Sequence, residues 1–134
     1  VGHTLGLARA NVEGAGLADR IELRLQDATT LDDTGGYDLI WLAMPFLPEA
    51  IVPAVLDAAH RALRPGGVLL PGTFAGPDDR LARLLVDLRT VRSGGRPWRP
   101  DELCELLAEH GFERPIVAER RWAAPVELYV ALRT

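Results

Sequence analysis

Apolar side chains recur every three or four residues in four stretches of the chain, the spacing that places them on one face of a helix. The first stretch begins near Leu5 and ends at Gly14 and Gly16. The last begins at Pro100, where proline and the two acids that follow it suit a first helical turn. The pattern predicts helices over residues 5–15, 51–63, 81–88 and 100–107.

Shorter stretches between these helices have the patterns of strands. Residues 21–25 and 126–132 alternate between apolar and polar side chains, as half-buried strands do. Residues 37–43 are almost continuously apolar, which is typical of a strand covered on both faces of a parallel sheet. Residues 68–70 and 115–118 form two more short runs. Helices and strands that alternate in this way predict an α/β fold with a mostly parallel sheet, closed by an antiparallel C-terminal hairpin.

The composition is that of a globular protein with one domain. The chain has 134 residues, of which 48% are hydrophobic and 25% are charged, so we treat residues 1–134 as a single domain. No apolar run approaches the ~18 residues needed to span a bilayer. The net charge is −4, which disfavours recognition of a nucleic-acid backbone.

The rarer residue types indicate neither metal nor disulfide chemistry. Cys104 is the only cysteine, so it has no partner for an internal disulfide, and it lacks neighbours at metal-ligand spacing. A lone thiol fits a reducing cytoplasm, and the first residues have no signal-peptide pattern. All 15 positions held by lysine or arginine are arginine, which we interpret as the codon bias of a GC-rich bacterial genome.

Four short signals follow one another in a fixed order. They are residues 8–11 with 16–21, residues 26–28 (QDA), residues 37–42 (YDLIWL) and residues 63–70 (LRPGGVLL). The ordered set resembles the class I S-adenosylmethionine-dependent methyltransferases over essentially the whole chain. No single signal is specific, since the turn at residues 64–67 alone only ends a helix. The resemblance implies a Rossmann-like sheet with the cofactor across the carboxyl ends of its strands.

The resemblance assigns an adenine-binding role to Asp27 and Ala28. In the family, the acid after the third strand accepts a hydrogen bond from the adenine amine, and the backbone of its neighbour holds the ring. An ionised carboxylate suits this role because it only accepts hydrogen bonds. The alternative is that Asp27 is a turn residue at a strand end, helped by Thr29 and Thr30.

The resemblance also places a loop beside the methyl group. Ala43 and Met44 follow the fourth strand of the family, where the methionine part of S-adenosylmethionine lies, and Phe46 would contact the substrate. The alternative is that Met44 and Phe46 cap the core. Ala43 stands where amine and amide methyltransferases have asparagine, which argues against nucleobase or glutamine methylation. Trp98 and Trp122 fall in loops that often cover the substrate, with packing as their alternative role.

Two features of the family are missing. The glycine-rich loop after the first strand and the ribose-binding acid after the second have no counterpart, and the chain begins at Val1 within a helical pattern. We therefore expect a sheet that lacks its first two strands. The strand at residues 38–43 would then be an exposed apolar edge. An upstream segment or another chain would complete the sheet, or the strand at 21–25 would pair with the one at 38–43.

No catalytic base can be assigned. His3, His60 and His110 are better explained as structural, and no nucleophile–base motif is present. Methyl transfer needs no such group where positioning of the nucleophile suffices. The leading hypothesis is an enzyme fragment that transfers a methyl group from S-adenosylmethionine to a small-molecule O, N or C nucleophile. The alternative is a non-catalytic fragment or interaction module that does not bind the cofactor alone.

Overall fold

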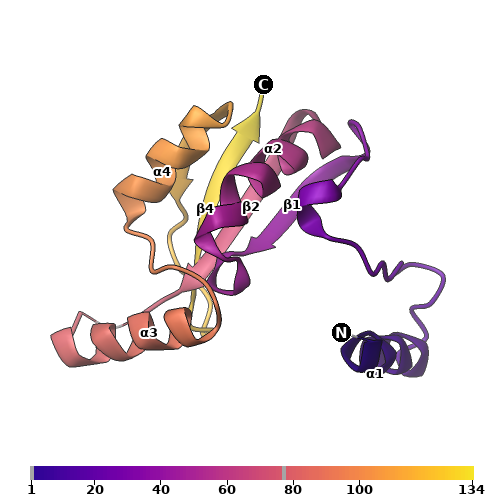
Figure 1. Cartoon of the computed structure of the whole chain (residues 1–134), viewed down its shortest axis with the longest axis horizontal. Helices are drawn as coiled ribbons and strands as arrows, with labels where there is room; N and C mark the ends of the chain where they lie inside the picture. Colours follow the sequence, from indigo (N-terminus) through magenta and orange to yellow (C-terminus); the bar gives the residue numbers. More distant parts are fainter. Residues whose placement is uncertain (1, 77) are drawn as a thin grey trace.

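The computed structural model describes residues 2–76 and 78–134. The predicted helices and most of the predicted strands are present (Figure 1). In chain order the elements are α1 (Gly2–Gly14), η1 (Ala28–Thr30), β1 (Tyr37–Ala43), η2 (Met44–Phe46), η3 (Glu49–Ile51), α2 (Val52–Ala62), β2 (Leu63–Phe74), α3 (Arg80–Arg92), α4 (Pro100–Glu109), β3 (Phe112–Val117) and β4 (Val126–Arg133).

Four strands form one mixed sheet in the order β1-β2-β4-β3. β1 and β2 are parallel, with Ala43 opposite Gly72, whereas β2–β4 and β3–β4 are antiparallel. The α/β class and the closing hairpin are confirmed. The expectation of a mostly parallel sheet is wrong for the described residues, because the hairpin places β4 directly beside β2 and only one of the three pairings is parallel.

The strand predicted at residues 21–25 does not form. This segment is irregular, and Ile21 and Leu25 are exposed. A strand exists only by pairing, and β1 pairs with β2 alone among the described residues. The alternating pattern shows that the side chains would suit one face of a sheet, but it does not provide a strand for this segment to pair with. Helix α1, which precedes this segment, has no buried residue and lies apart from the sheet (Figure 1).

β1 is an edge strand of the described sheet, and its surface is apolar. The side chain of Leu39 is 51% exposed and that of Trp41 is 61% exposed. The Trp41 indole packs over Gly72 on β2, where an added Cβ would lie 2.9 Å from Nε1 of Trp41. Gly72 therefore permits this close approach, and a larger residue there would displace the exposed Trp41 ring.

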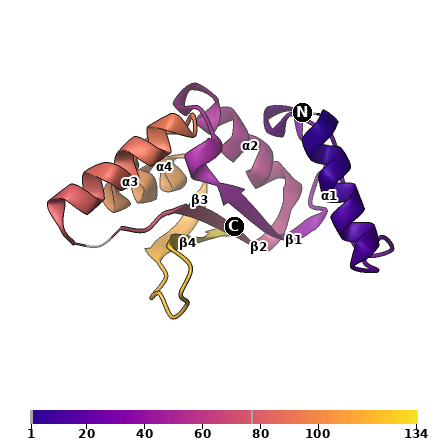
Figure 2. The same ribbon diagram turned by 90° about the horizontal axis from the view of Figure 1, so that it is seen from below.

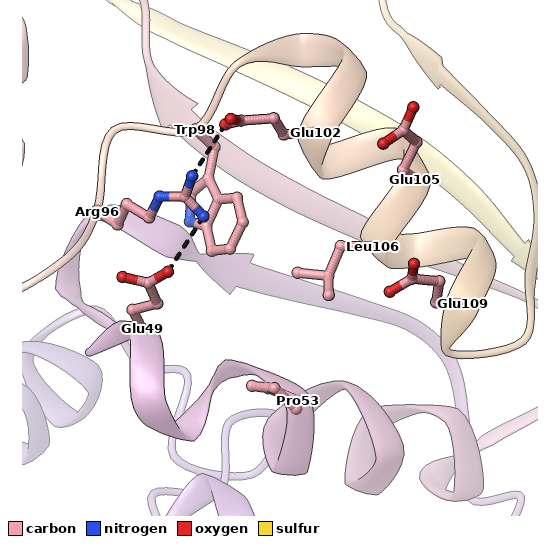
Figure 3. A pocket seen from close by; sticks show the side chains of 8 residues that line it. All are labelled: Glu49, Pro53, Arg96, Trp98, Glu102, Glu105, Leu106 and Glu109. Atoms are coloured by element: carbon pink, nitrogen blue, oxygen red, sulfur yellow. Dashed lines mark hydrogen bonds and ion pairs between the residues drawn. The ribbon is translucent and has the colours of Figure 1, made fainter.

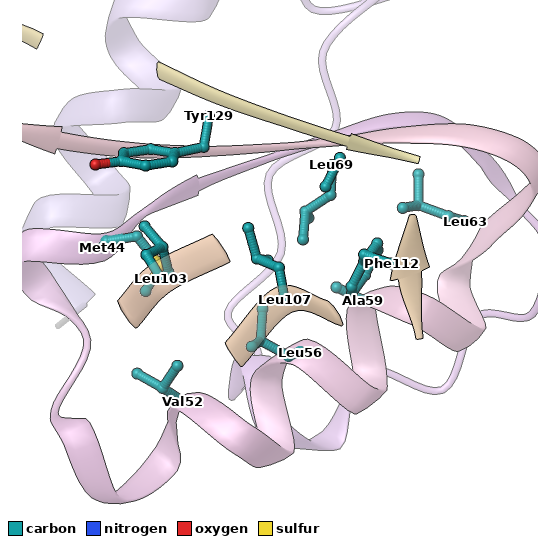
Figure 4. Packing of buried hydrophobic residues seen from close by; sticks show 11 residues of the cluster. Met44, Val52, Leu56, Ala59, Leu63, Leu69, Leu103, Leu107, Phe112 and Tyr129 are labelled. Carbon is teal, nitrogen blue, oxygen red and sulfur yellow. The ribbon is translucent and has the colours of Figure 1, made fainter. Parts of the chain in front are cut away.

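One hydrophobic core lies between α2, α4 and a single face of the sheet (Figure 4). The helical spacing seen in the sequence places one face of α2 in this core. The buried cluster consists of Met44, Val52, Leu56, Ala59, Leu63, Leu69, Leu103, Leu107, Phe112, Tyr129 and Ala131. α2 ends at Ala62, before a turn in which Gly66 has a φ of 76°, as the Arg-Pro-Gly-Gly sequence predicts.

Helix α3 forms as predicted, but its leucines do not face the core. Leu81, Leu84, Leu85 and Leu88 are 54–65% exposed. The opposite face, which carries Val86 and the buried Thr90, turns toward the sheet. Figure 2, seen from below, shows α3 in front of α4, from which it is separated in Figure 1. A 3.6-residue period identifies an apolar face but does not determine what covers it. None of the described helices is long and apolar enough to cross a membrane.

Candidate functional site

The carboxyl ends of the two parallel strands meet at one edge of the sheet. β1 ends at Ala43 and runs into η2, while β2 continues to Phe74. The rings of Phe46 and Phe74 pack edge to face, with centroids 6.1 Å apart. Ligands of open α/β sheets bind outside this edge. Two aromatic side chains therefore mark the part of the fold where a small molecule is expected.

A cavity of about 600 Å³ opens beside Phe74, between the end of β2, α3 and the segment leading into α4. We call it the α3–α4 cavity. A deeper hollow of about 60 Å³ continues from it to Pro45 in η2. Both are lined by Phe74, Val86, Asp87, Pro97, Trp98 and Glu127. The cavity thus connects the carboxyl end of β1 with the walls formed by α3 and β4.

Arg96 holds Trp98 in place, and Trp98 lines both this cavity and the neighbouring pocket drawn in Figure 3. Its guanidinium donates to Glu49 Oε1 and to Glu102 Oε2, each at 3.2 Å. Its Cζ also lies 4.4 Å from the centroid of the Trp98 ring. These contacts link η3, the start of α4 and the loop between α3 and α4. A planar guanidinium that stacks and bonds at both ends fixes the Trp98 ring more firmly than an ammonium would.

The inner wall of the cavity carries negative charge. Asp87 on α3 and Glu127 on β4 make no ion pair with an arginine among the described residues. The hydroxyl of Tyr129 donates to Oε1 of Glu127 at 2.8 Å. Burial raises the pKa of Tyr129 well above its usual value, and the hydrogen bond to Glu127 adds to this rise. Tyr129 therefore stays protonated and remains a donor at neutral pH.

Asp27 caps the short helix η1. Its Oδ1 accepts hydrogen bonds from the Thr29 backbone nitrogen at 2.8 Å and from the Thr29 hydroxyl at 2.7 Å. These bonds hold the pKa of the Asp27 carboxyl below its usual value. The turn role considered for Asp27 is thus present, and Oδ2 accepts no hydrogen bond from a described residue. Exposed Ala28 follows it, and η1 packs against α2. Oδ2 of Asp27 is therefore available to accept a hydrogen bond from a ligand.

The loop after β1 divides into buried and exposed residues. Met44 is 0% exposed, and its side chain belongs to the core shared with Leu103 (Figure 4). The whole residue, main chain included, is therefore covered, and its carbonyl oxygen packs against Gly95. Ala43 is half-buried, whereas Phe46 is 59% exposed. Of the two residues that might have capped the core, Met44 does so and Phe46 does not.

The two predicted tryptophans have different surroundings. Trp98 lines the α3–α4 cavity, and its buried Nε1 has no hydrogen-bond partner among the described residues. Trp122 lies between β3 and β4 and donates from Nε1 to the carbonyl oxygen of Val126 at 2.9 Å. The structure thus brings Trp98 to the cavity beside Phe74, whereas the bond of Trp122 stays within its own hairpin.

Sequence reasoning missed the residues that give the cavity its charge. Asp87 stands in a helix whose leucines suggested a buried stripe, and Glu127 stands in an alternating strand. Arg96 stands in the loop between α3 and α4, where no periodic pattern marks a site. The only available signal was the period of two that puts Glu127 on the same face of β4 as Tyr129. The meeting of α3 with β4 is a tertiary contact that no local pattern reveals.

The sheet order and the hairpin define the class of protein. The chain has the fold of the class I S-adenosylmethionine-dependent methyltransferases, which confirms the resemblance carried by its motifs. No protein-family model matches the chain. Ribosomal RNA small subunit methyltransferase H of Afipia carboxidovorans is 36% identical over 67 residues, which make up 49% of this chain and 20% of that protein.

Several solved structures share the fold. The mitomycin 7-O-methyltransferase MmcR is 26% identical with a TM-score of 0.78, over 97% of this chain and 39% of that one. PigF with SAH is 22% identical with a TM-score of 0.77, over 98% and 41%. The S-adenosylmethionine-dependent methyltransferase SibL is 24% identical with a TM-score of 0.74, over 96% and 40%. The chain therefore spans less than half the length of these proteins.

Proposed function

We propose that this chain carries the acceptor-binding part of an S-adenosylmethionine-dependent methyltransferase that methylates a small-molecule O, N or C nucleophile. The observation that carries the proposal is the α3–α4 cavity, which opens at the carboxyl ends of β1 and β2 beside Phe74. Its volume and its mixed aromatic and polar walls are those of small-molecule sites. The methyltransferase fold supplies the reaction class.

The residues of this chain suit parts of the cofactor. S-adenosylmethionine, when bound, supplies a methyl group already activated on a sulfonium. Oδ2 of Asp27 would accept the hydrogen bond of the adenine amine, with Ala28 beside the ring. Ala43, which is half-buried, would border the methionine part, and the buried Met44 would support this end of β1 from the core. Because the donor is activated, the contribution of the protein is to orient the acceptor.

The acceptor would lie against aromatic walls. Phe46 packs against Phe74 at the carboxyl ends of the strands, and Trp98 lines the hollow that reaches η2. Arg96 keeps the Trp98 ring in position. Trp122 would make no hydrogen bond to the acceptor from Nε1, because this atom donates to the carbonyl oxygen of Val126. Its ring could contribute only as part of the loop between β3 and β4. Hydrophobic contacts and shape would therefore hold the skeleton of the acceptor, and nearby polar groups would select it.

The setting that we propose is the bacterial cytoplasm, without nucleic-acid or membrane partners. The net charge of −4 supports a small substrate over a nucleic acid. Burial raises the pKa of the Cys104 thiol, which keeps this single cysteine protonated and poorly reactive. The exposed edge of β1 supports a further strand beside it, from an upstream segment or from another chain.

A second candidate function is an interaction module that binds no cofactor alone. It is favoured by the apolar edge of β1, where Leu39 and Trp41 are exposed, because an open edge can accept a strand from a partner. The two functions differ in whether the chain by itself binds S-adenosylhomocysteine, the cofactor product of methyl transfer.

The test is a calorimetric titration of S-adenosylhomocysteine into the full chain, with circular dichroism recorded on the same sample. We expect saturable binding with a stoichiometry near one. A folded chain that shows no heat of binding at millimolar S-adenosylhomocysteine would overturn the proposal of a cofactor-binding enzyme and would favour the interaction module.

A further inference from the structure

We infer that the α3–α4 cavity selects an acceptor with a protonated nitrogen on a planar apolar skeleton, and that Asp87 and Glu127 bind this cation. The inference rests on the proposed function, because it assigns a substrate class to the same cavity. It concerns residues that neither the motifs nor the fold family single out.

The first step is the balance of charge around the cavity. Arg83 lines the cavity and lies 3.8 Å from Asp78. Arg96 lines the deeper hollow, but its ion pairs are with Glu49 and Glu102. Arg89 stacks over Phe74, with Cζ 4.4 Å from the ring centroid, and Arg99 is exposed at the rim. The inner carboxylates of the cavity thus lack an arginine of their own among the described residues.

The second step is the chemistry that such carboxylates accept. Asp87 and Glu127 are half-buried and reach the cavity from α3 and β4. Ionised carboxylates accept hydrogen bonds and donate none. Enclosed charges are stabilised by a paired opposite charge, and a like charge beside them is strongly disfavoured. The cavity therefore favours an ammonium and rejects a carboxylate.

The third step is the orientation of Glu127. The Tyr129 hydroxyl holds Oε1 at 2.8 Å, and no described residue donates to Oε2. One oxygen is thereby anchored while the other stays available to a ligand. Tyr129 is itself fully buried in the core, so this anchor is rigid.

The fourth step is the shape of the walls. The flat rings of Phe74 and Trp98 line the cavity together with Val86 and Pro97. Arg96 covers part of the Trp98 ring and fixes its plane. These walls suit a planar apolar skeleton, and its charged end would meet Asp87 and Glu127.

Three probes with one phenol ring and different charge test the inference. They are tyramine, which is cationic at pH 7, tyrosol, which is neutral, and 4-hydroxyphenylacetate, which is anionic. Their affinities for the full chain are measured by ligand-observed NMR at low salt. We expect tyramine to bind about tenfold more tightly than tyrosol, with the acid weakest. Equal affinities, or no tyramine binding at millimolar concentration, would overturn the inference.

Charge-neutral variants locate the preference. Asp87→Asn and Glu127→Gln should each lower the advantage of tyramine over tyrosol by about threefold or more, while Asp87→Glu keeps it. Asp32→Asn removes the same charge from an exposed site away from the cavity and should change nothing. Circular dichroism shows that each variant is folded. A preference unaffected by both cavity variants would contradict the inference.

Titration of S-adenosylhomocysteine into the same samples separates the two proposals. Tyramine preference without binding of S-adenosylhomocysteine would leave a cation site and remove the proposed enzyme function. Binding of S-adenosylhomocysteine without any preference for tyramine would retain the enzyme function and remove the inference about its acceptor.

Discussion

Gly95 packs directly against the main chain of Pro45, so the loop that leads to Trp98 rests on the end of β1. A Cβ added at Gly95 would lie 2.9 Å from the carbonyl oxygen of Met44 and closer still to Pro45. Main-chain atoms cannot yield as a flexible side chain does. This contact places one wall of the α3–α4 cavity relative to η2.

Gly95→Ala should therefore destabilise the chain by about 1–3 kcal/mol, the usual cost of overpacking. Urea denaturation measures the loss, and the Trp98 indole resonance should shift because its loop moves. The control is Gly14→Ala, where a Cβ meets no atom within 4 Å. Equal stability of the two variants would contradict the account of this contact.

Arg96→Lys should loosen Trp98 although it keeps the positive charge. A lysine cannot bond Glu49 and Glu102 while stacking its head group on the indole. Because Arg96 is partly exposed, we expect a stability loss of no more than about 1 kcal/mol, but a clear change in tryptophan fluorescence and weaker probe binding. Arg121→Lys, in the exposed pair with Glu119, is the control. An unchanged Trp98 environment in Arg96→Lys would remove the positioning role.

Asp27→Ala should weaken binding of S-adenosylhomocysteine by roughly 1–2 kcal/mol, the scale of a lost hydrogen bond to a charged acceptor. Thr29→Ala removes the hydroxyl donor but leaves the carboxylate, so its effect should be smaller. Calorimetry gives both affinities. Similar losses in the two variants would mean that Asp27 acts only as the cap of η1.

Titration of Asp27 should change the affinity for S-adenosylhomocysteine little between about pH 5 and pH 8, because its carboxyl stays ionised there. Hydrogen bonds from Thr29 lower the pKa of this carboxyl in the folded chain. A lowered folded pKa stabilises the chain above the unfolded pKa, and this contribution disappears as the pH falls through the folded value. Calorimetry between these pH values measures the affinity for S-adenosylhomocysteine. A fall in affinity near pH 6 that is absent from Asp27→Ala would contradict the role assigned to Asp27.

Leu107→Ala and Leu85→Ala should differ strongly in stability. Leu107 is completely buried, so its truncation should cost about 2–5 kcal/mol. Leu85 is 58% exposed, so its truncation should stay within about 0.5 kcal/mol. Urea denaturation compares the two, and similar losses would show that the α3 leucines are covered in solution.

Local pattern predicted most elements of this fold. Apolar periods and runs place the four helices and β1, β3 and β4 close to their observed positions, since these patterns are local even though the strands form only by pairing. β2 is longer than predicted because Leu63 already pairs with Tyr37, before a register shift, and Phe74 still pairs with Val126 on β4. Such pairing depends on a strand far away in the chain.

Local pattern failed for two features, the segment at residues 21–25 and the leucines of α3. Both patterns identify an apolar face, yet both faces are exposed in the described structure. Whether an apolar face is buried depends on which element packs against it. That element lies elsewhere in the chain or outside the described residues.

The sequence by itself determined the α/β class, the closing hairpin, the methyltransferase resemblance and the position of Trp98 in the loop before the helix that begins at Pro100. It did so because turns, caps and periods are local. Only the tertiary structure decided that Met44 is buried, that β1 is an edge, and that Asp87 and Glu127 share a cavity. These outcomes require tertiary contacts that no local pattern contains. Burial in a common core brings η2 and β4 together, and α3 joins them through the face that carries Val86 and Thr90.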